Sequence, residues 1–327
     1  MPDLVYQHWS DDLDPEVCVS VDGNAPGRLN LSHWPGNRTP VRFRHDLSTG
    51  MCIKLAESKD RLETLRGITT VTNNHWDTDG ACSVFAVMQP ALALVNAPTL
   101  LSAAIAGDFG QFGTPEGVKL DLTLTALTKR HDSPVASDRF TDDLERRQAQ
   151  YEYALELIPR LLVNPDLHAD WFAQEFWSIQ QDLRTLREDD AELERFDTLD
   201  FCVVTSDRDL HETAVNTVTG CDRILSVVTG DDGGYRYKLR LTTLSWFDLL
   251  TGPPRQRLDW SDLNDRLNEE AAGPDGRWVC DDLKDPTPAL GFMNDAGELV
   301  PNTVRPETVK RLIAQFFSQG PYLPAGI

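Results

Sequence analysis

Residues 68–87 read ITTVTNNHWDTDGACSVFAV, and they contain the clearest structural pattern in the chain. Its first part is rich in β-branched residues and predicts a central strand over residues 67–74. A polar turn follows, and the apolar run over residues 80–95 predicts a helix that is interrupted at Pro90. A buried strand that turns directly into a helix is typical of an α/β protein, here with a mostly parallel sheet.

The turn between this strand and helix contains the sharpest chemical motif of the chain. Because alternate residues of an extended segment point the same way, His75, Asp77 and Asp79 can project together from the carboxyl end of the strand. This is the edge at which α/β sheets hold their ligands. One imidazole and two carboxylates suit a divalent ion such as Mn²⁺ or Mg²⁺. The alternative is that the acids are turn formers and helix caps and that His75 is incidental.

Two earlier segments predict neighbouring strands. VCVSVDGN (17–24) alternates in polarity and ends at Asp22, and RLNLSHWPGNRTP (28–40) reads as a strand that ends near Ser32 in a turn. We expect the strands that end at Asp22, Ser32 and Asn74 to lie in one sheet, with their carboxyl ends together.

The next segment, residues 46–66, predicts a helix with Asp46 or Ser48 as its N-cap. A second interpretation of Asp46 is a supporting contact to a ligand of the site. A strand predicted over residues 235–244 follows a predicted hairpin turn over residues 230–234.

The rest of the chain divides by composition. Residues 138–195 contain long helical patterns whose apolar stripes indicate packing against a core. Strand and helix patterns alternate again from residue 196, and ETVKRLIAQFFSQ (307–319) predicts a last helix. The predicted organisation is an α/β domain over 1–137, a helical connector over 138–195 and a second, smaller α/β domain over 196–327.

Composition and net charge limit the classes of function that the protein can have. The 327 residues carry a formal net charge of −21, which disfavours duplex nucleic acid as a partner. A small phosphorylated substrate stays compatible, because bound divalent cations reverse the local sign of a site. The apolar runs are too short to cross a bilayer and the first residues do not read as a signal peptide, so a cytoplasmic protein without membrane contact is expected. The six scattered cysteines indicate buried thiols.

The segment from His75 to Gly80 resembles the first motif of the DHH phosphoesterase superfamily. That superfamily includes inorganic pyrophosphatases, exopolyphosphatases, hydrolases of small oligonucleotides and cyclic dinucleotides, and single-strand exonucleases. Asp22 resembles its bridging aspartate, and Ser32-His33-Trp34 resembles the Asp-His-His segment, with His33 at the metal-binding histidine. DLST (46–49) resembles the Ser-Thr helix that follows, and AAIAGDFGQFG (103–113) resembles the last motif and supplies Asp108.

The chain departs from the superfamily in two respects. The two middle motifs precede the first, as in a permuted sheet, and Asp-His-His itself is absent. The whole chain also resembles an uncharacterised bacterial family that carries the motifs LSHWPGNxTP and NHxDTDG.

The resemblance implies a two-metal phosphoesterase with two Mn²⁺ or Mg²⁺ ions. Asp22 would bridge the ions and, together with Asp79, would be catalytic. His75 and Asp77 would complete one ion, and the other would be completed by Asp79, His33 and Asp108. A small second domain would grip a small phosphorylated substrate. The alternatives are a non-catalytic metal- or nucleotide-binding protein on a degenerate fold of this type, and a hydrolase that binds one metal only.

Several residues remain open between a functional and a structural role. His33 could be a turn histidine packed beside Trp34, and Asp108 could cap a helix. The candidates for substrate binding are cationic residues that an exposed strand or a helix start would also explain: Arg38, Arg42, His211, Arg236 and Arg240.

Overall fold

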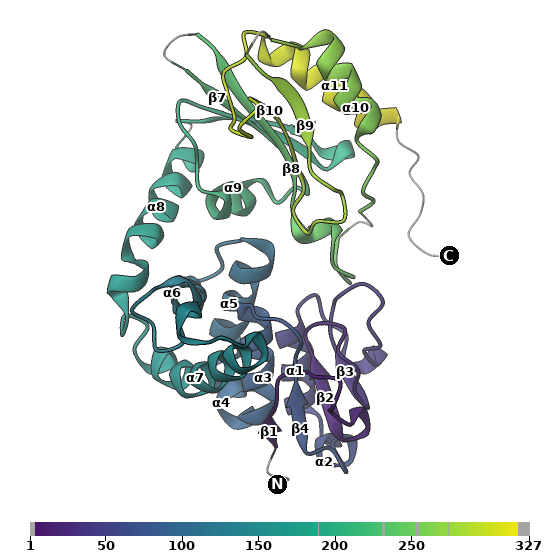
Figure 1. Ribbon diagram of the computed structural model, residues 1–327, viewed down its shortest axis with the longest axis vertical. Helices are drawn as coiled ribbons and strands as arrows, with labels where there is room; N and C mark the ends of the chain where they lie inside the picture. Colours follow the sequence, from purple (N-terminus) through teal and green to yellow (C-terminus); the bar gives the residue numbers. More distant parts are fainter. Residues whose placement is uncertain (1–3, 189, 231–232, 253–254, 274, 320–327) are drawn as a thin grey trace. The chain divides into compact units, whose positions relative to one another are not determined.

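The computed structural model describes residues 4–188, 190–230, 233–252, 255–273 and 275–319 (Figure 1). The chain forms two compact units. Unit 1 contains residues 1–177 together with the short segment Phe247–Thr251, and unit 2 contains residues 178–246 and 252–327. Both units combine helices with a sheet, so the protein is of mixed α/β type, as the sequence predicted.

The sheet of unit 1 is entirely parallel. Its four strands lie in the order β1-β4-β2-β3. They are short, and their bounds are Val5–Tyr6 for β1, Cys18–Val21 for β2, Leu29–Leu31 for β3 and Thr70–Thr72 for β4. The prediction that the strands before Asp22, Ser32 and Asn74 share one sheet, with their carboxyl ends together, is therefore confirmed.

The helices of unit 1 surround one core. Their bounds are Ser48–Glu57 for α1, Arg61–Thr64 for α2, Thr78–Met88 for α3, Pro90–Val95 for α4, Ala97–Phe109 for α5, Pro115–Lys129 for α6 and Asp143–Val163 for α7. Helix α3 is buried from Thr78 to Val87, as expected for a helix made mostly of apolar and small residues. The predicted interruption at Pro90 is confirmed, because α3 ends before it and α4 begins there.

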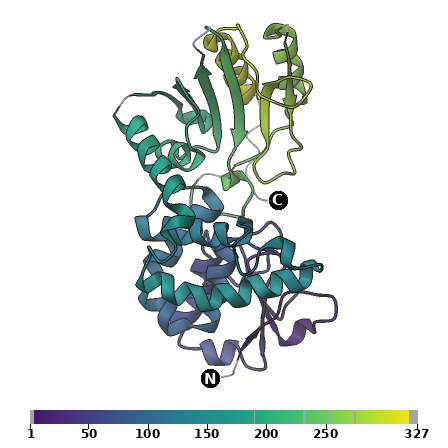
Figure 2. The same ribbon diagram turned by 60° about the vertical axis from the view of Figure 1, so that its left-hand side comes forward.

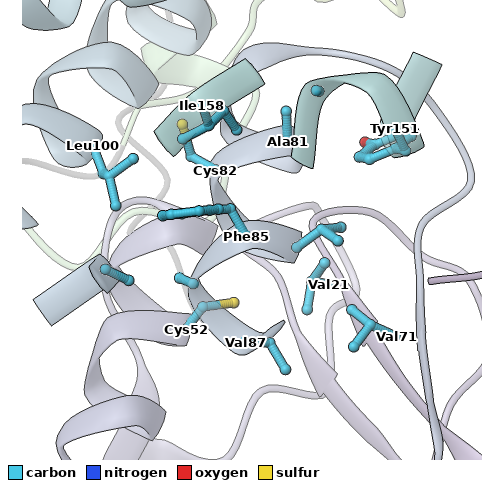
Figure 3. Close-up of a cluster of buried hydrophobic side chains, with 14 of the residues drawn as sticks. Val21, Cys52, Val71, Ala81, Cys82, Phe85, Val87, Leu100, Tyr151 and Ile158 are labelled. Carbon is cyan, nitrogen blue, oxygen red and sulfur yellow. The ribbon is translucent and has the colours of Figure 1, made fainter. Parts of the chain in front are cut away.

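The core of unit 1 joins the sheet to α3 and α7 (Figure 3). Val21 and Val71 come from the strands, Phe85 from α3, and Tyr151 and Ile158 from α7. Helix α7 thus packs into this unit, whereas the sequence placed residues 138–195 in a separate connector. The physical reason is the width of its apolar face, which buries enough surface to join the core. Helix α8 (Ala169–Arg187) crosses from unit 1 into unit 2.

Unit 2 is built on a mixed six-stranded sheet. The strand order is β5-β6-β7-β8-β10-β9, in which β6 and β7 pair in parallel and the other neighbours are antiparallel. The strands are Glu192–Phe196 for β5, Phe201–Ser206 for β6, Arg223–Thr229 for β7, Tyr235–Leu241 for β8, Arg277–Cys280 for β9 and Ala289–Met293 for β10. Strands β7 and β8 form the predicted hairpin, although residues 231 and 232 of its turn lie outside the described residues.

Three helices complete unit 2: α9 (Glu212–Thr219), α10 (Ser261–Glu270) and α11 (Pro306–Gln319). Helices α10 and α11 share one apolar cluster with the sheet, to which Trp260 and Trp278 contribute the largest side chains. Figure 2 shows α11, coloured yellow, beside the strands. The predicted last helix over residues 307–319 is confirmed. Among the helices of the described residues, none combines the length and apolar character that crossing a membrane requires.

The packing of α7 predicts how unit 1 responds to a cavity. Leu157 is 1% exposed in the core, whereas Leu144 on the same helix is 44% exposed. Leu157→Ala should therefore lower the free energy of unfolding by about 2–5 kcal/mol, and Leu144→Ala should change it by less than about 0.5 kcal/mol. Urea unfolding followed by tryptophan fluorescence measures both. If Leu157→Ala lowered the free energy of unfolding no more than Leu144→Ala does, α7 would not be part of the core.

Candidate metal centre

The carboxyl edge of the parallel sheet gathers the acidic and imidazole side chains of the site. Asp22 directly follows β2, and His33 comes two residues after β3. The loop after β4 contributes His75 and Asp77 and leads into α3, whose first turn contains Asp79. Asp108 lies near the end of α5. Because parallel strands end at the same edge, short loops are sufficient to bring these residues together.

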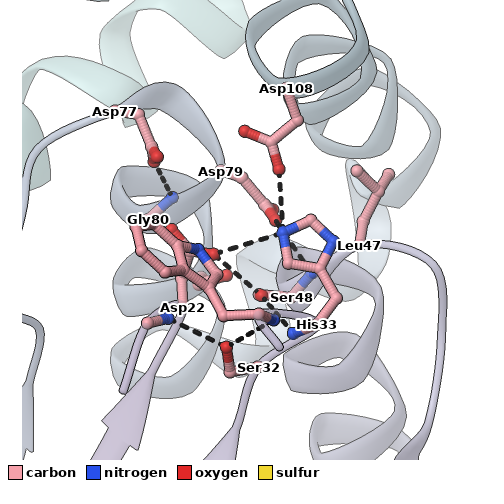
Figure 4. Close-up of polar contacts among 12 residues, drawn as sticks. Asp22, Ser32, His33, Leu47, Ser48, Asp77, Asp79, Gly80 and Asp108 are labelled. Atoms are coloured by element: carbon pink, nitrogen blue, oxygen red, sulfur yellow. Dashed lines mark hydrogen bonds and ion pairs between the residues drawn. The ribbon is translucent and has the colours of Figure 1, made fainter. Parts of the chain in front are cut away.

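Four of these residues form a fully buried group. One ligand atom each from Asp22, His33, Asp79 and Asp108 can be chosen so that all lie within 4.8 Å of one another. His33 Nε2 is the centre of the group, at 3.1 Å from Asp108 Oδ2, 3.5 Å from Asp22 Oδ1 and 3.6 Å from Asp79 Oδ2. Figure 4 shows the carboxylates of Asp79 and Asp108 pointing toward the His33 ring. We call these four residues the inner group.

The second group is more open and shares one residue with the first. His75 Nε2 lies 2.8 Å from Asp77 Oδ2 and 3.0 Å from Asp22 Oδ2. The side chains of His75 and Asp77 are 22% and 32% exposed. We call Asp22, His75 and Asp77 the outer group. Asp22 thus faces the inner group with Oδ1 and the outer group with Oδ2.

The backbone around Asp22 holds this shared carboxylate in place. Asp22 has φ 47°, a left-handed conformation that is unusual outside glycine, and Gly23 has φ 119°. The Asn73 side chain donates to the Asp22 carbonyl at 2.9 Å, and the Ser48 hydroxyl donates to Asp22 Oδ1 at 2.9 Å. A Cβ at position 23 would lie 2.4 Å from Asn74 Oδ1, so only glycine fits the turn.

The Asp79 carboxylate caps the N-terminus of helix α1. The backbone N–H groups of Ser48 and Thr49 donate to its two carboxylate oxygens, each at 2.8 Å. The prediction of Asp46 or Ser48 as the N-cap is therefore wrong: the N-cap is Leu47, which has no capping side chain, and a carboxylate from another segment takes that role. A helix N-terminus stabilises such an anion through its dipole.

Asp77 combines the two roles that the sequence left as alternatives. Its Oδ1 accepts from the Gly80 backbone N–H at 2.7 Å and so caps α3, while its Oδ2 faces His75. Capping a helix therefore does not remove this carboxylate from the ligand group.

The clustered carboxylates shift one another's proton affinity. Burial and the neighbouring Asp22 carboxylate raise the pKa of Asp79 to about 6. Burial, and then the charge of Asp79, raise the pKa of Asp108 well above its usual range. Burial and then Asp22 raise the pKa of Asp77. For Asp22 itself burial acts in the opposite direction to the imidazoles, but His75 and His33 prevail and hold its pKa far below its usual value.

The pKa values of the two imidazoles shift in the direction that favours their positively charged forms. Burial lowers the pKa of His33, but Asp108 and Asp22 outweigh it and raise this pKa well above its ordinary value. Burial likewise lowers the pKa of His75, but Asp77 and Asp22 outweigh it and raise this pKa well above its ordinary value. Without a metal the site therefore binds protons to offset its negative charge. A divalent cation would displace these protons.

The residues present fit a metal ion. Within the described part of the chain, the buried atoms Asp22 Oδ2 and His33 Nε2 have close ionic neighbours but no hydrogen bond of good geometry. Buried polar atoms in proteins normally have such a partner, and a cation bound between the carboxylates would supply it. Carboxylate oxygens with two imidazoles suit Mn²⁺ or Mg²⁺. The buried cluster of Asp and His side chains could thus hold a metal ion.

A family comparison covers nearly the whole chain. Residues 4–323 match the model of a family described as a family of unknown function, DUF6687. The chain belongs to the DUF6687 family. A comparison with curated proteins finds no match. In this DUF6687 chain the matched range includes every residue of both ligand groups and most of unit 2.

The contacts of the cationic candidates of unit 1 are with residues outside the ligand groups. Arg42 is exposed and pairs with Asp60 at 2.6 Å, and it also donates to Thr64. Arg38 is exposed, and its backbone N–H donates to the Asn30 side chain at 3.0 Å. The prediction that either arginine holds phosphate oxygens has no support from these contacts.

Two of the cationic candidates of unit 2, Arg236 and Arg240, line a cavity of about 360 Å³. Asp209 pairs with Arg236 and Glu212 with Arg240, and these acids offset much of the positive charge. His211 instead caps α9, with its Nδ1 accepting from the Thr213 N–H at 3.1 Å.

Sequence reasoning missed residues that touch the ligands from distant segments. Phe247 stacks on the His33 ring, with centroids 3.8 Å apart and planes at 15°. Tyr151 of α7 donates its hydroxyl to the His75 carbonyl at 3.0 Å. Their separation in sequence leaves no local pattern that could have indicated either contact.

The raised pKa of Asp79 predicts a pH dependence of the metal-free protein. With a folded pKa of about 6 against about 3.9 when unfolded, ionised Asp79 destabilises the fold by roughly 3 kcal/mol above pH 6. The fold is therefore more stable below about pH 4, where Asp79 is protonated, and it loses this additional stability as the pH rises through 6. In chelator, the thermal midpoint of the wild type should therefore fall more between pH 5 and 7.5 than that of Asp79→Asn, which mimics the protonated carboxyl.

Adding Mn²⁺ at pH 7.5 should raise the midpoint of the wild type and raise that of Asp79→Asn much less. The matched control is Asp60→Asn, which changes an exposed carboxylate of the same unit and should follow the wild type. Parallel pH curves for all three proteins in chelator would contradict the assignment of a strained Asp79.

Proposed function

We propose that the protein is a divalent-metal-dependent hydrolase of a small phosphoester or phosphoanhydride, using two Mn²⁺ or Mg²⁺ ions. The observation that carries the proposal is the shared carboxylate of Asp22, whose two oxygens face two different imidazole-containing ligand groups. A carboxylate shared between two such groups can hold two ions close together, as two-ion hydrolytic sites do.

The inner group would hold one ion through Asp22, His33, Asp79 and Asp108, and the outer group the other through Asp22, His75 and Asp77. Bound ions of this kind lower the pKa of a water molecule and stabilise negative charge on phosphoryl oxygens. The chain's own contribution is positioning. Ser48 orients Asp22 Oδ1, and the start of α1 orients Asp79, so both carboxylates are fixed before any ligand arrives.

Exposure supports a small substrate that approaches from one side. The inner group is almost completely buried, whereas His75 and Asp77 of the outer group are partly exposed. A phosphoryl group would therefore reach the site past the outer group. Trp34 lies beside the outer group, with its ring 4.7 Å from that of His75. Ligands that are only partly exposed favour a compact phosphate over a long duplex.

The resemblance to the DHH phosphoesterase superfamily is compatible with this geometry. The two ligand groups have the same membership that the resemblance implied for the two ions. The unusual motif order in the chain is also understandable, because β2, β3 and β4 are neighbours in the sheet whatever their order in the sequence. We propose a permuted relative of that superfamily on these grounds.

A non-catalytic metal-binding protein is the second candidate, and one observation favours it. Trp34 occupies the position where the Asp-His-His segment would have its second histidine, so the site has one imidazole fewer than that motif provides. Metal binding would then serve structure or sensing.

A substrate panel tests the proposal. The wild-type protein with Mn²⁺, with Mg²⁺ or with chelator should be assayed for product release from pyrophosphate, tripolyphosphate, a short oligonucleotide and a cyclic dinucleotide. We expect release from at least one of them that requires the metal. Asp22→Asn, which removes the shared carboxylate, should lower kcat/KM at least about 100-fold, while Asp60→Asn should leave it unchanged.

Each result has a distinct meaning. Mn²⁺ binding without any product release would favour the non-catalytic candidate. A wild type that binds no divalent ion would exclude both functions.

A further inference from the structure

His33 is held by a segment that lies more than 200 residues later in the chain. We call Phe247–Thr251 the strap; these residues belong to unit 1, although the chain on both sides of them belongs to unit 2. Phe247 lies flat against the His33 ring at 3.8 Å, and the Asp248 backbone N–H donates to the His33 carbonyl at 2.8 Å. The strap therefore contacts both the ring and the backbone of this ligand.

Asp46 fixes the other end of the strap. Its carboxylate accepts from the backbone N–H groups of Leu250, at 2.5 Å, and Thr251, at 3.1 Å, and also from the Thr251 hydroxyl. Three donors on one carboxylate form a strong anchor, because hydrogen bonds to a charged acceptor are about twice as strong as neutral ones. Asn37 adds a further contact by donating to Asp248 at 3.0 Å.

The backbone of Asp46 acts on the same histidine. His33 Nδ1 lies 2.5 Å from the Asp46 carbonyl oxygen, and because a carbonyl only accepts, Nδ1 must carry the proton. The other ring nitrogen, Nε2, is therefore the one that presents a lone pair toward the carboxylates of the inner group once it is deprotonated. Asp46 thus fixes the tautomer through its backbone and the stacking partner through its side chain.

We propose that Asp46 and the strap form a positioning device for His33, which orients Nε2 and selectively strengthens ion binding by the inner group. The inference rests on the metal site of the proposed function. The outer group is oriented mainly by other neighbours: His75 Nδ1 lies 3.2 Å from Asn74 Oδ1, Tyr151 donates to the His75 carbonyl, and Trp34 lies between His75 and Phe247. Two further rings, Phe109 and Trp34, lie against Phe247 and limit its movement.

The chain provides a graded set of variants. Asp46→Ala removes all three acceptor contacts to the strap, whereas Asp46→Asn retains an oxygen for the two backbone donors. Phe247→Leu keeps an apolar cover but loses the stacked ring, and it does not depend on Asp46. Asp60→Asn is the matched control, since it changes an exposed carboxylate of unit 1 that pairs with Arg42.

The measurement is a titration of the metal-free full chain with Mn²⁺, followed by calorimetry and by the electron paramagnetic resonance signal of free Mn²⁺. We expect the wild type to bind two ions. In Asp46→Ala the affinity for one of them should fall about 10- to 100-fold, the usual effect of losing a residue that supports a ligand, while the other ion binds as before. Phe247→Leu should weaken the same ion less, and Asp46→Asn should restore most of the affinity.

The outcomes separate this inference from the function on which it rests. A wild type that binds no Mn²⁺ overturns the metal site itself and this inference with it. Two ions bound by the wild type and bound equally tightly by Asp46→Ala and Phe247→Leu overturn only the role of the strap. An equal loss of both ions also overturns it, because the device acts on the inner group alone. If Asp46→Ala does not fold in chelator, Phe247→Leu decides.

Discussion

The carboxylate of Asp22 is fully buried between two imidazoles, and three further carboxylates are within reach of it. Such a concentration of like charge inside a protein is tolerated only when something positive is bound there, either protons or a cation. The surrounding structure holds these anionic groups in place. A strained turn at Asp22, the start of helix α1 opposite Asp79 and the Ser48 hydroxyl all supply donors or geometry that anionic groups need.

The order of strands explains why Asp22 is the shared residue. Strand β2 lies between β4 and β3, so the residue that ends it is next to the loops of both neighbours. His33 approaches from the side of β3, and His75 from the side of β4. A residue at the end of an edge strand would have one such neighbour only. Chain order is irrelevant to this geometry, because only adjacency at the carboxyl edge decides which side chains meet.

The sequence was informative where a local pattern dictates structure. The β-branched run before His75, the alternating run before Asp22 and the break at Pro90 correspond to β4, β2 and the end of α3. Asp22, His33 and Asp108 could be suggested because each closes a segment that resembles a known motif. Their spatial grouping follows from the parallel sheet, which a periodic pattern can indicate.

Other features could not be read in this way. The Asp46 side chain suggested a helix cap, but its partners Leu250 and Thr251 are about 200 residues away. Phe247 stands in a stretch with no motif, and its contact with His33 depends entirely on tertiary structure. The membership of α7 in unit 1 likewise depends on what its apolar face meets. The helix or strand propensity of a local segment carries no information about such long-range pairs.

The position of the strap in the chain has a consequence for biosynthesis. All six ligand side chains precede residue 109, so a ribosome makes them well before it reaches Phe247. Until residue 251 leaves the exit tunnel, His33 lacks its stacking contact with Phe247. Translation therefore includes an interval in which Phe247 does not yet cover the His33 ring. The complete surroundings of His33 therefore require a segment that is made well after all six ligands.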